Sequence, residues 1–209
     1  MTGRRACAVL AACMLLPPCA LASELVFSVS LDEQRIGEHR FRITGAADAR
    51  TVESEANFSV KLLGLTVYRY RHQAIEQWRG HCLSALSAST DDGGKTSRVQ
   101  AQARGDALEV VSPRGTASLP GCVMGFAYWS TAIRGQSQLL NAQTGQYESV
   151  QLHHAGREAI DVRGQPLSAE RWRIEGTEHP IDIWTLPNGD WVGLDSTVAG
   201  GRRLRYRLR

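Results

Sequence analysis

Apolar and charged side chains alternate with a period of two residues through most of this sequence. The last eight residues, RRLRYRLR (202–209), show it most clearly, because apolar side chains at 204, 206 and 208 alternate with arginines. The stretch EHRFRI (38–43) has the same pattern. A period of two sends successive side chains to opposite faces of a β-strand. Each strand then has one apolar and one mainly basic face, which predicts an antiparallel sheet with one face in water.

Turn signals divide the sequence at short intervals and indicate many strands. Clusters rich in Gly, Asp and Asn recur at 45–48, 91–94, 104–106, 163–165, 188–189 and 200–201. They separate about ten or eleven strands, and a sheet of that size curls instead of staying flat. We therefore expect a mainly β fold in which residues 23–209 form a single antiparallel β domain. The sheet is expected to be a barrel or a half-barrel.

Residues 1–22 have the features of an export signal. Arg4 and Arg5 precede the apolar run ACAVLAACMLL, and the segment ends in the small-residue cleavage pattern ALA at 20–22. We expect cleavage after Ala22 and a periplasmic location. No later segment is apolar enough to predict a transmembrane helix. The formal net charge of +3 gives no indication of a nucleic-acid partner.

The cysteines divide between the export signal and the rest of the chain. Three of the five lie at positions 7, 13 and 19, which leaves Cys82 and Cys122. In an oxidising compartment such a pair predicts a disulfide, here closing a loop of about forty residues and contributing roughly 4 kcal/mol to stability. The alternative is a pair of free thiols. The two cysteines have no CxxC spacing and the histidines are scattered, so neither a metal nor another cofactor is predicted.

A segment without charged side chains runs between Arg114 and Arg134 and contains the string CVMGFAYW (122–129). Its apolar residues fit helical spacing no worse than strand spacing, which favours a short irregular helix plus loop within residues 119–140. An uncharged segment with aromatic side chains on several sides does not lie on a wet surface. We expect it to plug the mouth of the curled sheet or cover its open face, held there through Cys122.

The aromatic side chains around this segment have two interpretations. A curled antiparallel sheet of this size either fills with its own side chains or encloses one apolar ligand. Aromatic residues on strands serve core packing as readily as ligand binding. The candidate ligand-binding residues are Tyr68, Tyr70, Trp78, Met124, Phe126, Tyr128, Trp129 and Trp184. The ligand class that they favour is an apolar or amphipathic molecule such as a lipid.

The string IDIWTLPNGDWVGLDS predicts a hairpin with its turn at 188–189. With a two-residue type I′ turn, Asp182 lies opposite Asp195 and Leu186 lies opposite Trp191. Two facing, partly desolvated carboxylates raise the pKa of one of them, as acid/base catalysis requires. The alternative is a solvent-facing surface on which Asp182 and Asp195 pair with arginines of a neighbouring strand.

Arginines recur on the polar faces of the expected strands. They are Arg40, Arg42, Arg69, Arg71, Arg171, Arg173, Arg203, Arg205 and Arg207. Such a surface can hold phosphate or carboxylate groups, for instance lipid headgroups. The alternative is an exposed sheet face on which acidic side chains neutralise the arginines.

Six strings follow one another in a recognisable order. They are GEHRFRI, LTVYRYRHQAIEQWRG, CVMGFAYW, LLNAQTGQY, PIDIW and GGRRLRYRL. Together they resemble an exported bacterial family called domain of unknown function 6134, and their layout is similar to the larger family numbered 3108. The resemblance covers nearly the whole chain after the export signal. It implies an envelope protein rich in antiparallel strands, akin to the curved sheets that carry lipoproteins or lipids between membranes, and it assigns no activity and no functional residue.

Three functions are compatible with these features. The first is a non-enzymatic periplasmic protein that binds an apolar or amphipathic ligand inside the curled sheet. The second is an envelope enzyme, a hydrolase or isomerase, that uses Asp182 and Asp195. The third is a scaffold whose exposed strand edge recruits an envelope protein by β-augmentation. The charge-free segment and the aromatic strand faces favour the first.

Overall fold

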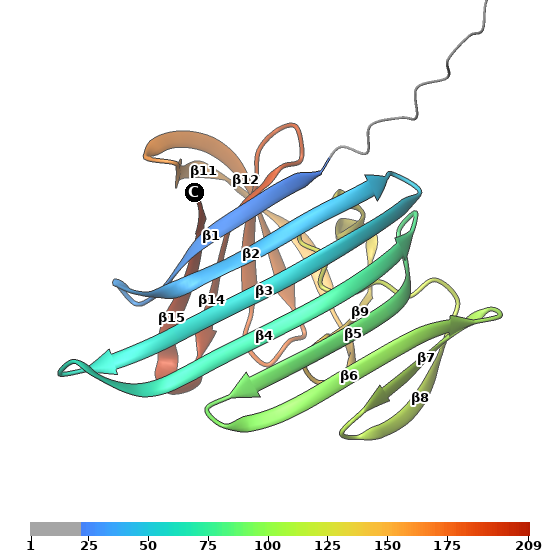
Figure 1. Ribbon diagram of the computed structural model, residues 1–209. Coiled ribbons are helices and arrows are strands. Elements are labelled where there is room, and N and C mark those ends of the chain that lie inside the picture. The colour runs from blue at the N-terminus through green and yellow to red at the C-terminus, as the bar shows by residue number, and fades with distance from the viewer. Residues whose placement is uncertain (1–21) are drawn as a thin grey trace, which may run out of the picture.

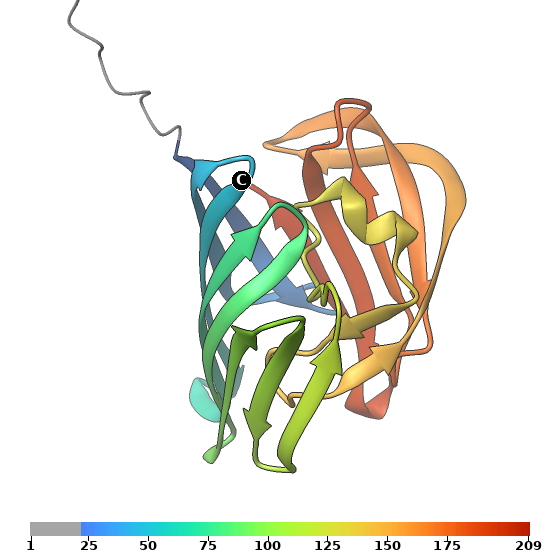
Figure 2. The same cartoon turned by 90° about the vertical axis from the view of Figure 1, so that its right-hand side faces the viewer.

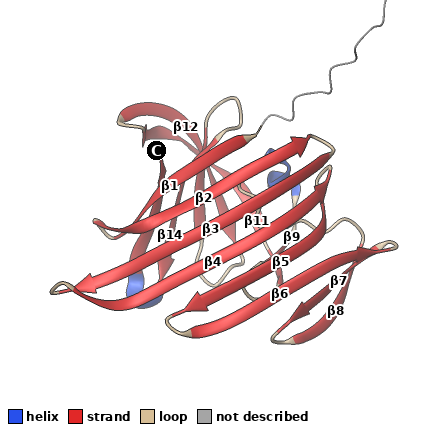
Figure 3. Cartoon of the chain, in the orientation of Figure 1, coloured by secondary structure: helices blue, strands red, loops and turns tan. Residues whose placement is uncertain are grey.

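The main structural element is an antiparallel sheet of thirteen strands, accompanied by a two-stranded hairpin (Figures 1 and 3). The computed structural model describes residues 22–209, so the predicted export signal lies outside the described residues apart from Ala22. The strands of the large sheet are β1 (Ser23–Leu31), β2 (Gln34–Ala46), β3 (Ala49–Leu62), β4 (Leu65–Arg79), β5 (Cys82–Asp92), β6 (Lys95–Arg104), β7 (Ala107–Ser112), β8 (Gly115–Pro120), β11 (Gln151–Val162), β12 (Gln165–Glu175), β13 (Ile181–Thr185), β14 (Trp191–Val198) and β15 (Arg202–Leu208). The remaining elements are the hairpin strands β9 (Gln138–Leu140) and β10 (Tyr147–Ser149) and the short 3-10 helices η1 (Thr131–Gly135) and η2 (Ala199–Gly201).

The strands of the large sheet pair with their neighbours in sequence, and β15 also pairs with β1. This last pairing joins the two ends of the described chain, with Phe27 opposite Leu208 and Val29 opposite Tyr206. The sheet curls so that its two halves face each other (Figure 2). Its edges, β8 and β11, do not pair with each other. The predicted curled antiparallel sheet is therefore confirmed in its open form, and it keeps the free edges that the β-augmentation alternative requires.

The large sheet has more strands than the ten or eleven that the turn signals indicated. Residues 95–120 alone form three short strands, β6 to β8. The turn between β7 and β8 is built on Pro113 and Arg114, and the turn between β3 and β4 on Leu63 and Gly64. Neither pair carries the Asn-Gly or Asp-Gly signal of a tight hairpin. Each turn has only an isolated glycine or proline as its signal, Gly64 in one and Pro113 in the other, which is weaker than such a pair.

The inner face of the curled sheet holds the apolar half of the alternating pattern. Phe27 on β1 has no exposed surface, and its ring centroid lies 4.1 Å from that of Trp191 on β14. Phe41 on β2 and Tyr206 on β15 complete the cluster, with centroids 6.1 and 6.2 Å from that of Phe27. Fully buried aromatic side chains remove large apolar areas from water. This cluster therefore stabilises the join between the two halves of the sheet.

Residues 121–150, here called the cap, run through the space between the two halves of the sheet (Figure 2). The predicted disulfide between Cys82 and Cys122 is present, with Cα atoms 4.9 Å apart, and it ties the start of the cap to β5. Beside it, the N–H of Leu83 donates to the carbonyl oxygen of Val123 at 2.8 Å. Five cap side chains are at most 1% exposed: Val123, Met124, Ile133, Leu139 and Leu140. The charge-free segment is thus an interior segment, as predicted, and its helical part is the short helix η1.

Candidate functional site

Small side chains occupy the centre of the inner face on β3 to β5. The register places four residues in one row across β2 to β5: His39, Ala56, His72 and Thr90. The adjacent row consists of Phe41, Ser54, Ala74 and Ala88. Residues in register on antiparallel neighbours point to the same face, about 5 Å apart. The short side chains in these rows do not reach the cap, so a hollow remains between the sheet and the cap.

This hollow is a cavity of about 550 Å³ on the inner face of the sheet, here called the inner cavity. The cap lines it with Phe126, Tyr128 and Trp129, and its rim consists of cap residues 141–148 and the loop 176–179 between β12 and β13. The ring of Trp129 meets that of Trp78 edge to face, with centroids 5.4 Å apart, which fixes this side of the cavity. Small-molecule sites typically measure about 300–1,000 Å³, so the inner cavity is large enough for one ligand.

Two histidines line the inner cavity from the sheet. His39 Nε2 hydrogen-bonds the hydroxyl of Ser54 at 2.8 Å, and His72 Nδ1 hydrogen-bonds that of Thr90 at 2.9 Å. Burial lowers the pKa of His39 to about 3 and that of His72 to about 4, because it disfavours the charged imidazolium. Both rings are therefore neutral at physiological pH and present hydrogen-bonding groups without charge.

Glu76 brings a carboxyl group into the same cavity. The indole N–H of Trp78 donates to this carboxylate at 3.0 Å. Burial raises the pKa of Glu76 to about 7, against a smaller opposite effect of that hydrogen bond. Glu148 and Glu178 also line the cavity, and no Lys or Arg is among its described lining residues. The lining therefore favours neutral or cationic groups over anions.

The structure places three of the predicted ligand-binding residues in the inner cavity: Phe126, Tyr128 and Trp129. Two others pack behind it, since Met124 is 1% exposed and Trp78 is 2% exposed. Burial raises the pKa of the Tyr128 hydroxyl, so this group remains a neutral hydrogen-bonding group. These five residues form and support one side of the cavity.

The remaining three predicted residues lie elsewhere. The ring of Tyr70 stacks on that of Phe58, with centroids 5.2 Å apart, beside a shallow hollow on β3 and β4. Tyr68 lies near the tip of the same hairpin, where its hydroxyl donates to Asp92 at 2.5 Å. Trp184 faces the other side of β13 and donates to Glu158 at 2.8 Å. Aromatic type alone did not show which face or which end of a strand these residues occupy.

His39, His72 and Glu76 were not among the predicted site residues. The strand pattern nevertheless carried a signal for all three. In EHRFRI, His39 has the same parity as Phe41 and Ile43. In YRYRHQAIEQWR, His72 and Glu76 have the same parity as Tyr70 and Trp78, so an alternating strand places them on the apolar face. A glutamate at such a position is either protonated, paired or functional.

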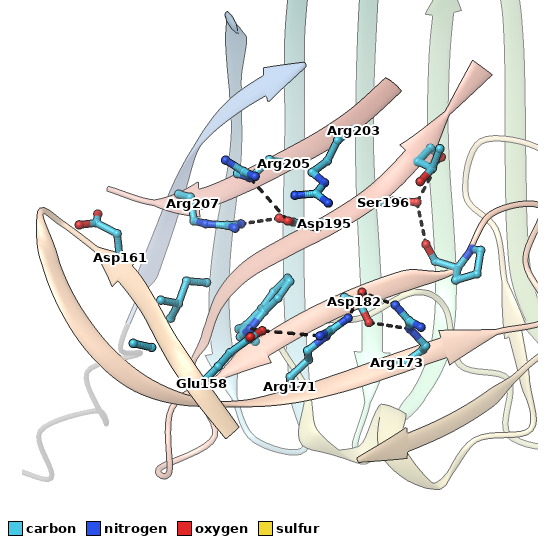
Figure 4. Close-up of a pocket in the computed structure, with 15 residues that line it drawn as sticks. Glu158, Asp161, Arg171, Arg173, Asp182, Asp195, Ser196, Arg203, Arg205 and Arg207 are labelled. Carbon is cyan, nitrogen blue, oxygen red and sulfur yellow. Dashed lines mark hydrogen bonds and ion pairs between the residues drawn. The ribbon is translucent and has the colours of Figure 1, made fainter. Parts of the chain in front are cut away.

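A second pocket, of about 540 Å³, lies on the opposite face of β12 to β15, beneath the bend of β11 (Figure 4). The predicted pairing of Asp182 with Asp195 is present in the register. The predicted pairing of Leu186 with Trp191 is wrong, because a bulge after Trp184 places Trp191 opposite Thr185. The bulge turns Trp191 into the core, away from the two aspartates.

Both aspartates of this outer pocket are bound by arginines (Figure 4). Asp182 accepts hydrogen bonds from Arg171 and Arg173, each at 2.8 Å, and Asp195 accepts one from Arg207 at 2.6 Å. Burial opposes ionisation of Asp182, but the hydrogen bonds from Arg173 and Arg171 outweigh it, and its pKa is lowered. A lowered pKa keeps the carboxylate ionised, whereas a general acid needs a raised one. The geometry therefore supports the ion-pair interpretation of these aspartates.

We expect Asp182→Asn to lower the free energy of unfolding by about 2 kcal/mol, because it removes a carboxylate that accepts charged hydrogen bonds from two arginines. Urea denaturation at neutral pH measures the change. Glu24→Gln is the matched control, since the pair of Glu24 and Arg40 is half exposed at 3.6 Å and is expected to contribute less than about 1 kcal/mol. Equal effects of the two substitutions would contradict a structural role for the Asp182 pairs.

Within residues 22–209, no group of three or more His, Cys, Asp or Glu side chains is arranged to hold a metal ion. In the same part of the chain, no helix combines the length and the apolar composition that crossing a bilayer needs.

Comparison with known proteins places the chain in a family and a fold. A search of curated proteins found no match. A solved structure described as a beta-barrel-like protein of domain of unknown function DUF1849 from Brucella abortus is similar, with a TM-score of 0.62 and 12% sequence identity. The match covers 89% of this chain and 94% of that one, and at this identity it shows a shared fold. Residues 27–209 match the family described as Domain of unknown function (DUF6134). The chain, with its curled sheet and interior cap, therefore belongs to the DUF6134 family.

Proposed function

We propose that this chain is a non-enzymatic binding protein that holds one amphipathic molecule in the inner cavity. The observation that carries this proposal is the cavity itself, a space of about 550 Å³ between small side chains of the sheet and aromatic side chains of the cap. A protein core normally fills such space with side chains, because close packing stabilises it. Small residues at the centre of the inner face keep the space open.

The lining favours a particular kind of ligand. Phe41, Phe126 and Trp129 offer apolar surface for a hydrocarbon or ring system. His39, His72 and Glu76 offer hydrogen-bonding groups on the sheet side. Because the charged groups of the lining are carboxylates, the proposed ligand has an apolar body and a neutral or cationic polar head. A single-chain lipid with an amine or hydroxyl head has this chemistry.

We also propose that the protein acts in the periplasm. Two features support this location. Residues 1–22 have the pattern of an export signal, and the Cys82–Cys122 disulfide suits an oxidising compartment. Amphipathic molecules that leave a membrane need a carrier or a buffer in an aqueous space, and a cavity between the sheet and the cap provides one.

Ala74→Leu tests the proposal by filling the cavity. Ala74 is 3% exposed and lines the cavity floor, so the larger side chain occupies ligand space while the sheet keeps its register. The probes are dodecylamine, dodecanol and dodecyl phosphate below their micellar concentrations, and the measurement is isothermal titration calorimetry. We expect the wild-type protein to bind the amine and the alcohol at least about tenfold more tightly than the phosphate. We expect Ala74→Leu to weaken both by at least about tenfold.

The control is Ala103→Leu, which adds the same side chain at an exposed position on β6. Its binding is expected to equal that of the wild-type protein. Circular dichroism verifies that both variants keep their strands. Wild-type binding that Ala74→Leu leaves unchanged would place the ligand outside the inner cavity and contradict the proposal.

A further inference from the structure

The turn between β3 and β4 exposes an unusual amount of apolar surface. Among the described residues, seven large hydrophobic side chains are exposed, and five of them lie within residues 62–68. Leu62 is 64% exposed, Leu63 is 96% exposed and Leu65 is 73% exposed. Single exposed apolar residues are ordinary, but a contiguous group marks an interaction site. We call residues 62–67 the leucine tip.

The backbone conformation at the leucine tip disfavours a leucine, so folding alone does not explain the presence of one there. Leu63 has φ of 50°, in the left-handed region that disfavours residues with a Cβ. The other two described non-glycine residues with positive φ are Asp32 and Arg163, both polar turn residues. Asn, Asp or Gly at position 63 would suit both the backbone and the solvent better. A leucine there is unfavourable for the isolated fold on both counts. We therefore infer that Leu63 contacts something outside this chain.

The base of the leucine tip is basic. Lys61, Arg69 and Arg71 are exposed, and none of them has an ion pair among the described residues. Asp91, opposite Arg71 on the adjoining strand, accepts a hydrogen bond from the N–H of Gly94, and Asp92 accepts one from the hydroxyl of Tyr68. A strand rises about 3.3 Å per residue, so Arg69 lies about 13 Å behind Leu65. The tip thus places apolar side chains ahead of unpaired positive charges.

We propose that the leucine tip inserts into the surface of a lipid bilayer that contains anionic headgroups. Surface-bound segments bury apolar side chains about 5–10 Å deep, and basic residues behind them contact the headgroups. The order of leucines and cations along this hairpin matches that depth. The tip is a narrow projecting turn, at the lower left of Figure 1, and a fluid bilayer accommodates such a shape without a complementary groove. This surface is separate from the inner cavity, so the proposal goes beyond ligand binding and does not depend on it.

Vesicle flotation tests the proposal directly. The probes are vesicles of equal parts phosphatidylglycerol and phosphatidylethanolamine, and vesicles of phosphatidylcholine alone. We expect the wild-type protein to associate with the anionic vesicles. Leu63→Asn is expected to weaken this association by about tenfold, because it removes the most exposed leucine from the bilayer. Combining Leu62→Ser, Leu63→Asn and Leu65→Ser is expected to abolish it.

Thermal stability separates this role from a folding role. Leu63→Asn is expected to unfold at the same temperature as the wild-type protein or higher, because Asn tolerates positive φ. Ile75→Asn is the matched control, since Ile75 is 51% exposed on β4 outside the tip, and its vesicle association is expected to be unchanged. Arg69→Gln with Arg71→Gln is expected to weaken association with anionic vesicles and to reduce its dependence on salt.

Two results would overturn the proposal. One is a negative flotation result: the wild-type protein does not float with anionic vesicles, or Leu63→Asn floats as well as the wild type. The other is a concentration-dependent dimer that Leu63→Asn dissolves while vesicle association stays unchanged, which would assign the tip to a second copy of the chain.

Discussion

Replacing Cys82 and Cys122 together with alanine is expected to lower the free energy of unfolding by about 4 kcal/mol. The disulfide spans 40 residues, and closing a loop of that length removes conformational entropy from the unfolded chain. Urea denaturation of the variant beside the wild-type protein measures the difference. A loss below about 1 kcal/mol would mean that the bond constrains the unfolded chain far less than its loop length implies.

The same variant also shows what the disulfide does for the cap. Beyond the bond, the cap is held to β5 by the hydrogen bond from Leu83 to Val123, and within itself by one from Leu140 to Met124. We therefore expect the cap to remain inside the sheet but to open locally more often. Hydrogen exchange should become faster at residues 122–129 than in β1 or β2. Uniform acceleration over the whole chain would indicate that the bond does not act on the cap in particular.

Glu76→Gln is expected to raise the free energy of unfolding by about 3 kcal/mol at pH 8 and to have little effect near pH 5. The native pKa of Glu76 is about 7, above the ordinary value of 4.5, so the native state binds its proton more tightly than the unfolded state. The stability associated with that proton is present at low pH and is lost as pH rises through 7. A tenfold difference in proton affinity corresponds to about 1.4 kcal/mol, which gives the expected size. Glutamine keeps the acceptor for the Trp78 indole but carries no charge.

The two cavity histidines have the opposite effect on how stability depends on pH. The pKa values of His39 and His72, about 3 and about 4, lie below the ordinary 6.5, so acidification protonates the unfolded chain first and destabilises the native state. Through most of the range from pH 6.5 to 4.5 the unfolded chain holds two protons on these histidines, whereas the native state holds one, on Glu76. For these three groups, stability falls by about 1.4 kcal/mol per pH unit in that window.

Urea denaturation from pH 8 to pH 4.5 checks both predictions. Glu76→Gln should steepen the loss of stability toward acid, because it removes the group that takes up a proton in the native state. His72→Gln should make that loss shallower. A Glu76→Gln variant with the same pH profile as the wild-type protein would show that the Glu76 carboxyl group is well solvated and that burial does not raise its pKa.

The fold class was predictable because it rests on many local signals that agree. The terminal alternation of Leu204, Tyr206 and Leu208 with arginines predicts the inner face of β15, and each of these residues pairs in register with an apolar residue of β1. The disulfide followed from the presence of two cysteines outside the export signal. The interior position of the cap was predictable because residues 122–129 include no charged side chain, so burying them costs no desolvation of a charge.

The details that escaped prediction depend on single backbone choices or on partners distant in sequence. The bulge after Trp184 moves Trp191 to the other face, and a two-residue periodicity has no means of showing it. The Leu63–Gly64 turn carries only a weak signal, because a leucine stands where turns favour Asn, Asp or Gly. The inner cavity depends on Ser54 and Ala74 being neighbours across strands, which the sequence shows only once the register is known.

Native mass spectrometry of the protein, purified from its host without added lipid or detergent, tests the central claim most directly. A cavity of about 550 Å³ that holds one amphipathic molecule predicts one adduct per chain, of a mass shared among preparations and absent from Ala74→Leu. Organic extraction should then yield a molecule with an apolar body and a neutral or cationic head. A wild-type protein that shows its own mass alone, and that none of the dodecyl probes binds, would contradict the account.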